Sequence, residues 1–400
     1  MQILHRLFWT PAVLLLLGAP VSAQATPVAV TKTETTPVFA HLMPWFESRE
    51  FSGAWGQHWT MNTQNPDDLL EDRQQIAAHH YPLTGPYASG DPDLIEYQLL
   101  LMKLSGIDGV MIDWPGTTVL YDYPRNRANA EALIGQLGRF GLKYAMVYED
   151  QNVRIAFERG VVTDPLAQVR KDLLFLQQNH FSDPQYFQVQ GHPLLMVFGP
   201  QTVQKPSDWA DLLENLNPQP CLVSLWYEVQ EISADCRGEH AWVYQDARPH
   251  LEHLKSFYAQ RQNFGVKMGS AYPGFHDFYQ EGGWGEGYFH IPVGLDTFRQ
   301  TLDLALRSKV DVVQLVTWND HGEGTAIEPT REFGFQFLTH LQERLGVSGL
   351  GEQDLKLVLE LYQQRKKHAG SPEQQKRLDQ VSGWMSVLKM NEAAALLRAQ

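Results

Sequence analysis

The sequence predicts an α/β protein, a (β/α)8 TIM barrel followed by a C-terminal helical hairpin, and three observations lead to this fold class. Eight short runs rich in apolar, β-branched and aromatic residues recur along the chain. Longer stretches with a helical apolar period separate most of these runs, as consecutive βα units require. Beyond about residue 346 the chain becomes rich in Leu, Gln, Lys and Glu, which favour helices. Alternation of this length favours a closed barrel over a doubly wound sheet.

The strands are predicted at residues 38–46, 106–114, 143–149, 193–199, 221–228, 241–245, 267–275 and 310–318. Amphipathic helices are predicted between them at residues 93–104, 129–140, 165–179, 208–216, 249–263 and 295–308. The connection between the fifth and sixth strands is too short for a full helix, so we expect a reduced unit there. The C-terminal hairpin is predicted from helices at 352–368 and 372–397, and we expect it to stabilise the barrel.

The N-terminus has the pattern of a secretory signal peptide over residues 1–23. Arg6 precedes a mostly apolar stretch at 7–21, and small residues follow at the expected cleavage position. The sequence therefore predicts a secreted or periplasmic protein. No later stretch is long and apolar enough to cross a membrane, so we expect no membrane span in the mature chain. The remaining chain divides into a catalytic barrel at 24–346 and a helical extension at 347–400.

Charge and cysteine content restrict the possible partners. The chain has 32 Lys and Arg residues against 46 Asp and Glu residues, a formal charge of −14, and no basic cluster for phosphate contacts. We therefore expect no nucleic-acid partner. Cys221 and Cys236 are the only cysteines, and an oxidising compartment would allow them to form a disulfide worth about 3 kcal/mol. The alternative is a pair of buried free thiols.

The strongest functional signal lies directly after the last predicted strand, where the chain reads TWNDHGEGT over residues 317–325. Asp320 and Glu323 are three residues apart, and glycosidic bond cleavage requires one carboxyl group to protonate the leaving oxygen and another to assist the nucleophile. Gly322 and Gly324 allow the loop to turn tightly. Two other interpretations fit the segment alone, namely a polar turn and a set of oxygen ligands for a hard cation such as calcium.

The other predicted strand ends, and the long segment 47–90 after the first strand, carry a mixture of aromatic and acidic residues. Barrel enzymes build their sites at the C-terminal ends of the strands, and aromatic faces with carboxylates suit a carbohydrate cleft. Each residue alone could instead cap a helix or pack in the core. We predict no cofactor or metal, because His79 and His80 lack a zinc-ligand spacing. Substrate contacts are predicted at Trp45, His58, Trp59, Tyr87, Asp113, Trp114, Tyr148, Glu149, Trp226, Tyr227, Tyr244, Tyr272, Trp318, Asn319 and His321.

Several motifs also resemble those of glycoside hydrolase families 99 and 71, most closely the bacterial group that lies between them. The likeness extends from about residue 39 to 346. The motifs that carry it are HYPLTGPY at 80–87, DPD at 91–93, GIDGVMIDW at 106–114 and WNDHGEGTAIEP at 318–329. Family 99 members are endo-acting α-mannosidases with a (β/α)8 fold, and family 71 members are α-1,3-glucanases. The resemblance therefore implies hydrolysis of an α-linked oligo- or polysaccharide, with an internal cut.

The resemblance implies that Glu323 is the general acid and Asp320 the general base. The segment 324–328 matches family 99, whereas Asp320 stands where that family has Glu, and the start at Trp318 is similar to family 71. In the family 99 route the base takes the proton of the sugar 2-hydroxyl, which gives retention. In the family 71 route it activates water, which gives inversion. The shorter side chain of Asp320 leaves more room and favours inversion.

Two other functions compete with this hypothesis. The first is a non-catalytic glycan-binding protein on a TIM-barrel scaffold, since Asp320 and His321 depart from family 99. The second is a cation-dependent hydrolase of a non-sugar ester, which would use the same acids as ligands. A glycoside hydrolase that acts on α-mannan or α-glucan is the function that the sequence favours.

Overall fold

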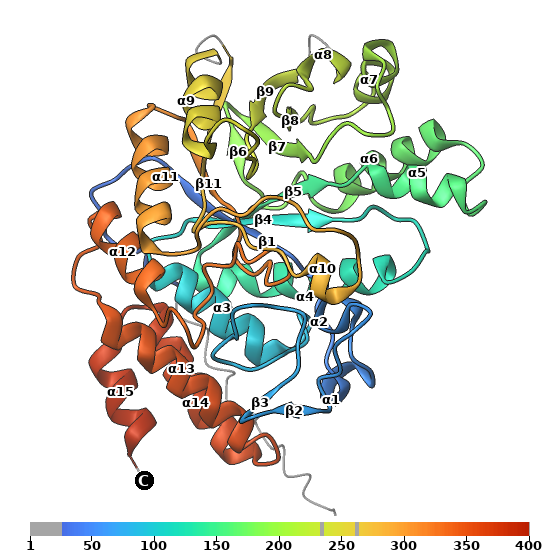
Figure 1. The fold of residues 1–400 in the computed structure, drawn as a ribbon. Coiled ribbons are helices and arrows are strands. Elements are labelled where there is room, and N and C mark those ends of the chain that lie inside the picture. The colour runs from blue at the N-terminus through green and yellow to red at the C-terminus, as the bar shows by residue number, and fades with distance from the viewer. Residues whose placement is uncertain (1–25, 233–235, 261–263, 400) are drawn as a thin grey trace, which may run out of the picture.

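The computed structural model describes residues 26–232, 236–260 and 264–399. Eight parallel strands form a closed barrel in the order β5-β4-β1-β11-β10-β9-β8-β7, and β7 pairs with β5 to close it (Figure 1). The strands are β1 (Val38–Leu42), β4 (Gly109–Trp114), β5 (Lys143–Tyr148), β7 (His192–Val197), β8 (Cys221–Leu225), β9 (Cys236–His240), β10 (Val266–Ala271) and β11 (Val312–Leu315). The predicted (β/α)8 fold is therefore confirmed. The predicted signal peptide lies outside the described residues.

Helices cover the outside of the barrel, and shorter elements decorate its loops. The helices of the barrel region are α1 (Arg49–Ser52), α2 (Gln57–Thr60), α3 (Pro92–Leu104), α4 (Tyr123–Phe140), α5 (Gln151–Glu158), α6 (Pro165–Asn179), α7 (Pro206–Leu213), α8 (Val229–Ile232), α9 (His250–Gln260), α10 (Tyr279–Gly282), α11 (Leu295–Arg307) and α12 (Gln336–Leu345). The short strand β6 (Gln188–Val189) pairs antiparallel with β7, and β2 (Leu69–Leu70) and β3 (Arg73–Gln74) form a small hairpin. The reduced unit expected between the fifth and sixth strands is the four-residue helix α8.

The predicted sixth strand, at 241–245, is wrong by a few residues, because the structure places this strand at β9 (Cys236–His240). Its sequence, Cys-Arg-Gly-Glu-His, is polar and gives no apolar signal. Gly238 permits the strand because a side chain there would meet the Val266 carbonyl, its Cβ only 2.2 Å from that oxygen. Buried Glu239 accepts a hydrogen bond from the backbone N–H of Val229 at 3.0 Å. This bond offsets part of the cost of burying the carboxyl group.

Side chains that alternate along the strands build two layers of core. One set points into the barrel and includes Phe39, Met111, Val147 and Met196, which form an apolar plug. The other set packs outward against the helices and joins the larger hydrophobic cluster. Because successive strand residues point to opposite faces, the positions of Met111 and Val147 fix the direction of every other residue on β4 and β5.

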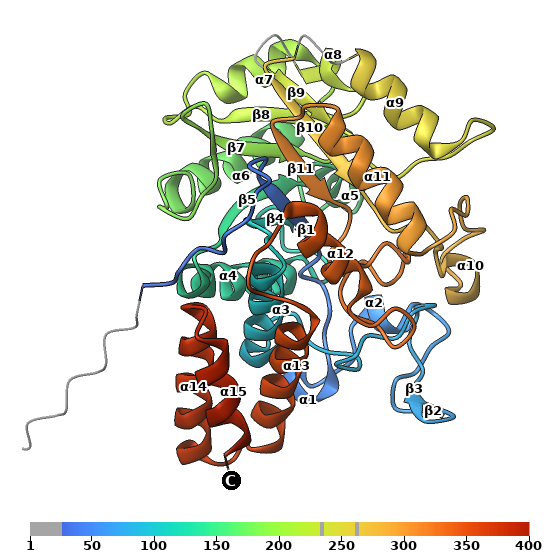
Figure 2. The same cartoon turned by 90° about the vertical axis from the view of Figure 1, so that its left-hand side faces the viewer.

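The C-terminal extension contains three helices instead of the predicted hairpin. They are α13 (Glu352–Lys367), α14 (Pro372–Ser386) and α15 (Met390–Arg398). Leu388 adopts a left-handed conformation, with φ 62°, in the segment that separates α14 from α15. The three helices lie together outside the barrel, where α13 packs on α3 (Figures 1 and 2). Buried Arg365 of α13 forms two hydrogen bonds with Glu96 of α3, at 2.9 and 3.1 Å.

Candidate active site

The loop after β11 folds back on itself and presents Asp320 and Glu323 at the C-terminal mouth of the barrel. Backbone hydrogen bonds close it, from Thr317 N–H to Thr325 O at 3.0 Å and from Glu328 N–H to the carbonyl of Trp318 at 2.9 Å. Gly324 has φ 68° and lies so close to His276 that a Cβ atom would be 2.7 Å from the His276 carbonyl oxygen. A glycine is therefore required at this turn.

The two acids are held in different ways. Asp320 is buried, and its Oδ1 accepts the backbone N–H of Glu323 at 3.0 Å, which fixes one carboxyl group against the backbone of the other. Glu323 is partly exposed, and the Tyr279 hydroxyl donates to its Oε1 at 2.9 Å. Tyr279 belongs to α10, in the loop after β10. Sequence reasoning missed it because its helix is a four-residue insertion with no periodicity.

Two further carboxyl groups, Asp113 and Glu149, face the same space from the end of β4 and from the segment after β5. Met111 and Val147 point into the barrel, so the residues two positions later on each chain segment point inward as well. Asp113 is buried near the end of β4, and Glu149 follows β5 and is partly exposed. The structure therefore brings four predicted site residues together, namely Asp113, Glu149, Asp320 and Glu323.

Burial and mutual repulsion change the acidity of this group. Burial, together with the negative charges of Glu149 and Asp320, raises the pKa of Asp113 well above its usual range. Burial also raises the pKa of Glu149 to about 7. For Glu323, burial and the charges of Asp320, Asp277 and Glu149 raise the pKa well above that of an ordinary glutamate, although the Tyr279 hydrogen bond opposes the rise. Burial raises the pKa of Asp320 less strongly, because backbone N–H groups and the His58 and His321 rings favour its charged form.

Aromatic rings border the mouth on the side of β1 and the loop after β10. Trp45 stacks on His58 with ring centroids 4.2 Å apart, and His58 meets the edge of Trp284 at 5.7 Å. Trp284 in turn stacks with Tyr279 at 6.0 Å. Trp284 and Tyr288 are exposed, and neither was among the predicted substrate contacts, because the glycine-rich segment around them resembles a flexible loop. Trp45 and His58 were predicted.

A second aromatic group follows β8 and β9. Trp226 stacks on Tyr227 at 5.5 Å and meets the edge of Tyr244 at 6.3 Å. Tyr227 and Tyr244 are exposed, so these predicted contact residues do reach solvent. We call the loop at residues 317–325, which follows β11, the acid loop. In the barrel order β11 lies between β1 and β10, so the acid loop has Trp45 on the side of β1 and Trp284 on the side of β10.

Eight other predicted contact residues are fully or almost fully buried, which does not fit direct contact with a substrate. Trp114 and Tyr148 point outward, where Trp114 stacks on Phe175 and the Tyr148 hydroxyl donates to Asp172. The hydroxyl of Tyr272 lies 3.0 Å from His250 Nδ1. Of the remaining five, Trp318, Asn319 and His321 belong to the acid loop itself, and Trp59 and Tyr87 pack against His321.

The predicted disulfide is absent from the structure, where Cys221 and Cys236 are free thiols. Cys236 pairs with Leu222, the neighbour of Cys221, across β8 and β9. Because successive residues alternate in direction, Cys221 points into the barrel plug while Cys236 packs outside it. The two sulfur atoms therefore lie on opposite faces of the sheet. Burial raises the pKa of the Cys221 thiol to about 11.

Neither a metal-binding cluster nor a membrane-spanning helix is found among the described residues. Within residues 26–232, 236–260 and 264–399, no cluster of three or more His, Cys, Asp or Glu side chains is arranged to hold a metal ion. In the same part of the chain, no helix has the length and apolar character needed to span a membrane.

The overall structure is similar to solved glycoside hydrolase structures. No protein-family model and no curated protein sequence matches the chain. The GH99 endo-α-mannosidase from Bacteroides thetaiotaomicron matches with a TM-score of 0.59 and 16% identity, over 82% of this chain and 98% of that one. A structure of the same enzyme with bis-tris propane matches over 78% and 97%, also at TM-score 0.59 and 16% identity. A glycoside hydrolase-like protein matches with a TM-score of 0.56 and 14% identity, over 81% and 98%. The chain therefore shares its fold with these three structures.

Proposed function

We propose that this protein is a glycoside hydrolase that cleaves α-linked glycans of the mannan or glucan type, with Glu323 as general acid and Asp320 as general base. One observation carries the proposal. Asp320 and Glu323 lie on a single rigid loop at the mouth of the barrel, inside an aromatic rim, and face two more carboxyl groups. Barrel enzymes hold their reacting groups at this end of the strands.

The surroundings of Glu323 suit a general acid. A group that protonates the leaving oxygen must hold its own proton at working pH, and burial beside Asp320 and Glu149 raises the pKa of Glu323 in that direction. The Tyr279 hydroxyl fixes the orientation of the carboxyl group at 2.9 Å. In the reaction, Glu323 gives its proton to the glycosidic oxygen as the bond to the anomeric carbon breaks, and becomes a carboxylate.

The surroundings of Asp320 suit a base. Backbone N–H groups and the neighbouring histidine rings favour its charged form, so it is the more readily ionised member of the pair. Asp320 takes one proton, either from a water molecule that attacks the anomeric carbon or from the sugar 2-hydroxyl that closes on it. The first route inverts the anomeric configuration and the second retains it. We propose inversion, because the shorter aspartate leaves room for water.

The aromatic groups support an extended sugar chain as substrate. Trp284 and Tyr288 follow β10 and Tyr244 follows β9, so these three exposed rings lie on one side of the acid loop. Partly exposed Trp45 follows β1, on the other side. A glycan that stacks on rings of both sides would continue past the cut in each direction, which corresponds to endo action. The structurally similar Bacteroides enzyme is an endo-α-mannosidase.

From the pattern of residues 1–23 we also propose that the protein is exported to the periplasm or secreted.

Removal of the acid provides the test. Glu323→Gln keeps the shape of the side chain but cannot donate the proton, so we expect kcat on an α-mannan or α-1,3-glucan substrate to fall at least about 100-fold. Exposed Glu286 offers a matched control, and Glu286→Gln should leave kcat within about twofold of the wild type. Full activity in Glu323→Gln would rule out the assigned role. Tight glycan binding without turnover in the wild type would indicate the binding-protein alternative.

A further inference from the structure

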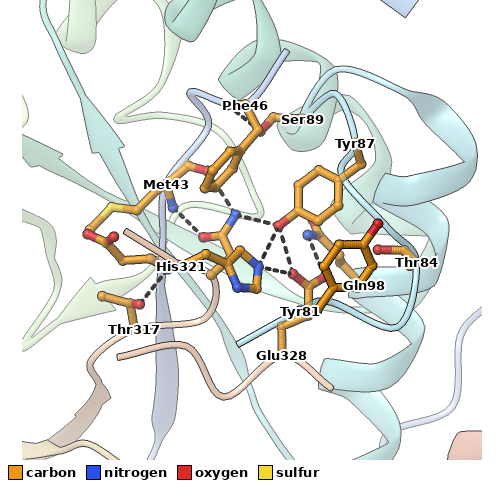
Figure 3. Close-up of polar contacts among 12 residues, drawn as sticks. Met43, Phe46, Tyr81, Thr84, Tyr87, Ser89, Gln98, Thr317, His321 and Glu328 are labelled. Atoms are coloured by element: carbon orange, nitrogen blue, oxygen red, sulfur yellow. Dashed lines mark hydrogen bonds and ion pairs between the residues drawn. The ribbon is translucent and has the colours of Figure 1, made fainter. Parts of the chain in front are cut away.

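A fully buried carboxylate, Glu328, lies directly beneath the acid loop. Its two oxygen atoms accept hydrogen bonds from the Tyr87 hydroxyl at 2.7 Å and from Gln98 Nε2 at 2.9 Å, and His321 Nε2 lies at 3.2 Å. Figure 3 shows Tyr87, Gln98 and His321 around Glu328, with dashed lines for these contacts. Among the described residues, no lysine or arginine forms a salt bridge with Glu328. The three donors therefore account for the burial of this charge.

The same network holds both sequence neighbours of Asp320. His321, the residue after it, contacts Glu328 and has its ring stacked on Trp59 with centroids 5.4 Å apart. Asn319, the residue before it, accepts from the backbone N–H of Met43 at 2.8 Å. It also donates to the Met43 carbonyl at 3.0 Å and to the Tyr87 hydroxyl at 3.3 Å. The Tyr87 hydroxyl thus accepts a hydrogen bond from Asn319 and donates one to Glu328, which links the two residues.

The network also has an electrostatic consequence for Asp320. His321 Nε2 lies 3.2 Å from a Glu328 oxygen, and this contact holds the ring next to Asp320 in the chain. The His321 ring lowers the pKa of Asp320 and opposes the rise that burial causes. Loss of the Glu328 contact would therefore remove a geometric tether from the loop.

We propose that Tyr87 and Glu328 are positioning residues that fix Asp320 through its two neighbours, Asn319 and His321. This inference rests on the proposed function for its kinetic consequence, since it identifies what holds the base in place. Both residues are buried, and they contact the loop through Asn319 and His321. Their effect must therefore pass through the loop, and it should appear in the chemical step more than in the binding of substrate.

The chain provides a matched pair of variants for the test. Tyr87→Phe removes only the hydroxyl that joins Asn319 to Glu328. Tyr97 is another buried tyrosine, on α3, and among the described residues its hydroxyl has no hydrogen-bond partner. Tyr97→Phe therefore makes the same chemical change in the same kind of surroundings without breaking a contact. A general loss of packing would affect both variants alike, whereas loss of positioning would affect only the first.

Two measurements on the full chain distinguish failure of this inference from failure of the proposed function. For Tyr87→Phe we expect kcat to fall by up to about 100-fold while KM stays within about threefold of the wild type, with Tyr97→Phe unchanged in both. Hydrogen exchange by mass spectrometry needs no turnover, and we expect peptides covering 317–328 to exchange faster in Tyr87→Phe alone. Unchanged exchange and wild-type kcat in Tyr87→Phe would overturn the proposal.

The remaining outcomes also decide the question. If the wild type shows no turnover on any glycan, the proposed function fails, and the exchange rates of 317–328 alone support or overturn the positioning role. If Tyr87→Phe does not fold, Gln98→Met carries the test, because it removes a donor to Glu328 from the side away from Asp320. It should speed exchange in the same peptides, and unchanged exchange there would contradict the proposal.

Discussion

At the scale of single residues, the site depends on four carboxyl groups whose surroundings differ. Asp113 is buried and Glu323 is partly buried, and both lie beside other negative charges, so that their pKa values are raised well above the usual range. Burial also raises the pKa of Asp320, but backbone N–H groups and nearby histidine rings oppose the rise by favouring its charged form. Burial raises the pKa of Glu149 to about 7. Such differences among neighbouring acids support the proposal that Glu323 donates a proton and Asp320 accepts one.

Substitution of Glu149 tests this coupling. The negative charge of Glu149 helps to raise the pKa of Glu323, so Glu149→Gln should lower that pKa. Glu323 must be protonated to act, and the basic limb of the pH profile of kcat/KM should therefore move to lower pH. Exposed Glu281 serves as the control, and Glu281→Gln should leave the limb in place. A limb that stays fixed or moves to higher pH in Glu149→Gln would contradict the coupling.

Strand alternation explains which single residues could be predicted from the sequence. Asp320 and Glu323 were identifiable because a paired-acid loop after an apolar run is a strong pattern. Asp113 and Trp114 are adjacent on one strand, so only one of them can face the barrel, and the same holds for Tyr148 and Glu149. The apolar plug residues two positions earlier assign the inward face to the acids. Tyr279 could not be predicted, because only the tertiary fold brings it to Glu323.

At the scale of elements, the strands and most helices follow from apolar periodicity, and the exceptions have local causes. The polar strand β9 is stabilised by the close approach of Gly238 to β10 and by buried hydrogen bonds, neither of which leaves an apolar signal. The break between α14 and α15 contains Leu388, which adopts a left-handed conformation that leucine seldom takes. The predicted disulfide failed because spacing along the chain does not reveal the face of the sheet on which each cysteine lies.

The contact between α13 and α3 gives a prediction about stability. Arg365 and Glu96 are both buried and share two hydrogen bonds. Among the described residues, Arg365→Met leaves the buried Glu96 carboxylate with Arg139, at 3.1 Å, as its one charged partner. We expect the free energy of unfolding to fall by about 3 kcal/mol in urea denaturation. Lys356→Met breaks the exposed pair with Glu352 and should cost less than about 1 kcal/mol. Equal losses in the two variants would show that the buried pair has no special role.

At the scale of the whole molecule, charge restricts the substrate further. The chain has a formal charge of −14, and four carboxyl groups face the mouth. A polyanionic glycan would be repelled, whereas a neutral α-mannan or α-glucan would meet aromatic faces and hydrogen-bonding acids. Neutral polysaccharides are therefore the right compounds for the decisive assay.

The most direct measurement incubates the mature protein, beside Glu323→Gln, with α-mannan and with α-1,3-glucan, and follows the anomeric proton of new reducing ends by NMR. We predict that the wild type releases product from at least one polymer, that the variant releases none, and that the first product is the β-anomer formed by water activated by Asp320. An α-anomer as first product would indicate the route through the 2-hydroxyl. No new reducing ends from either polymer, with binding of the glycan retained, would contradict the assignment as a hydrolase.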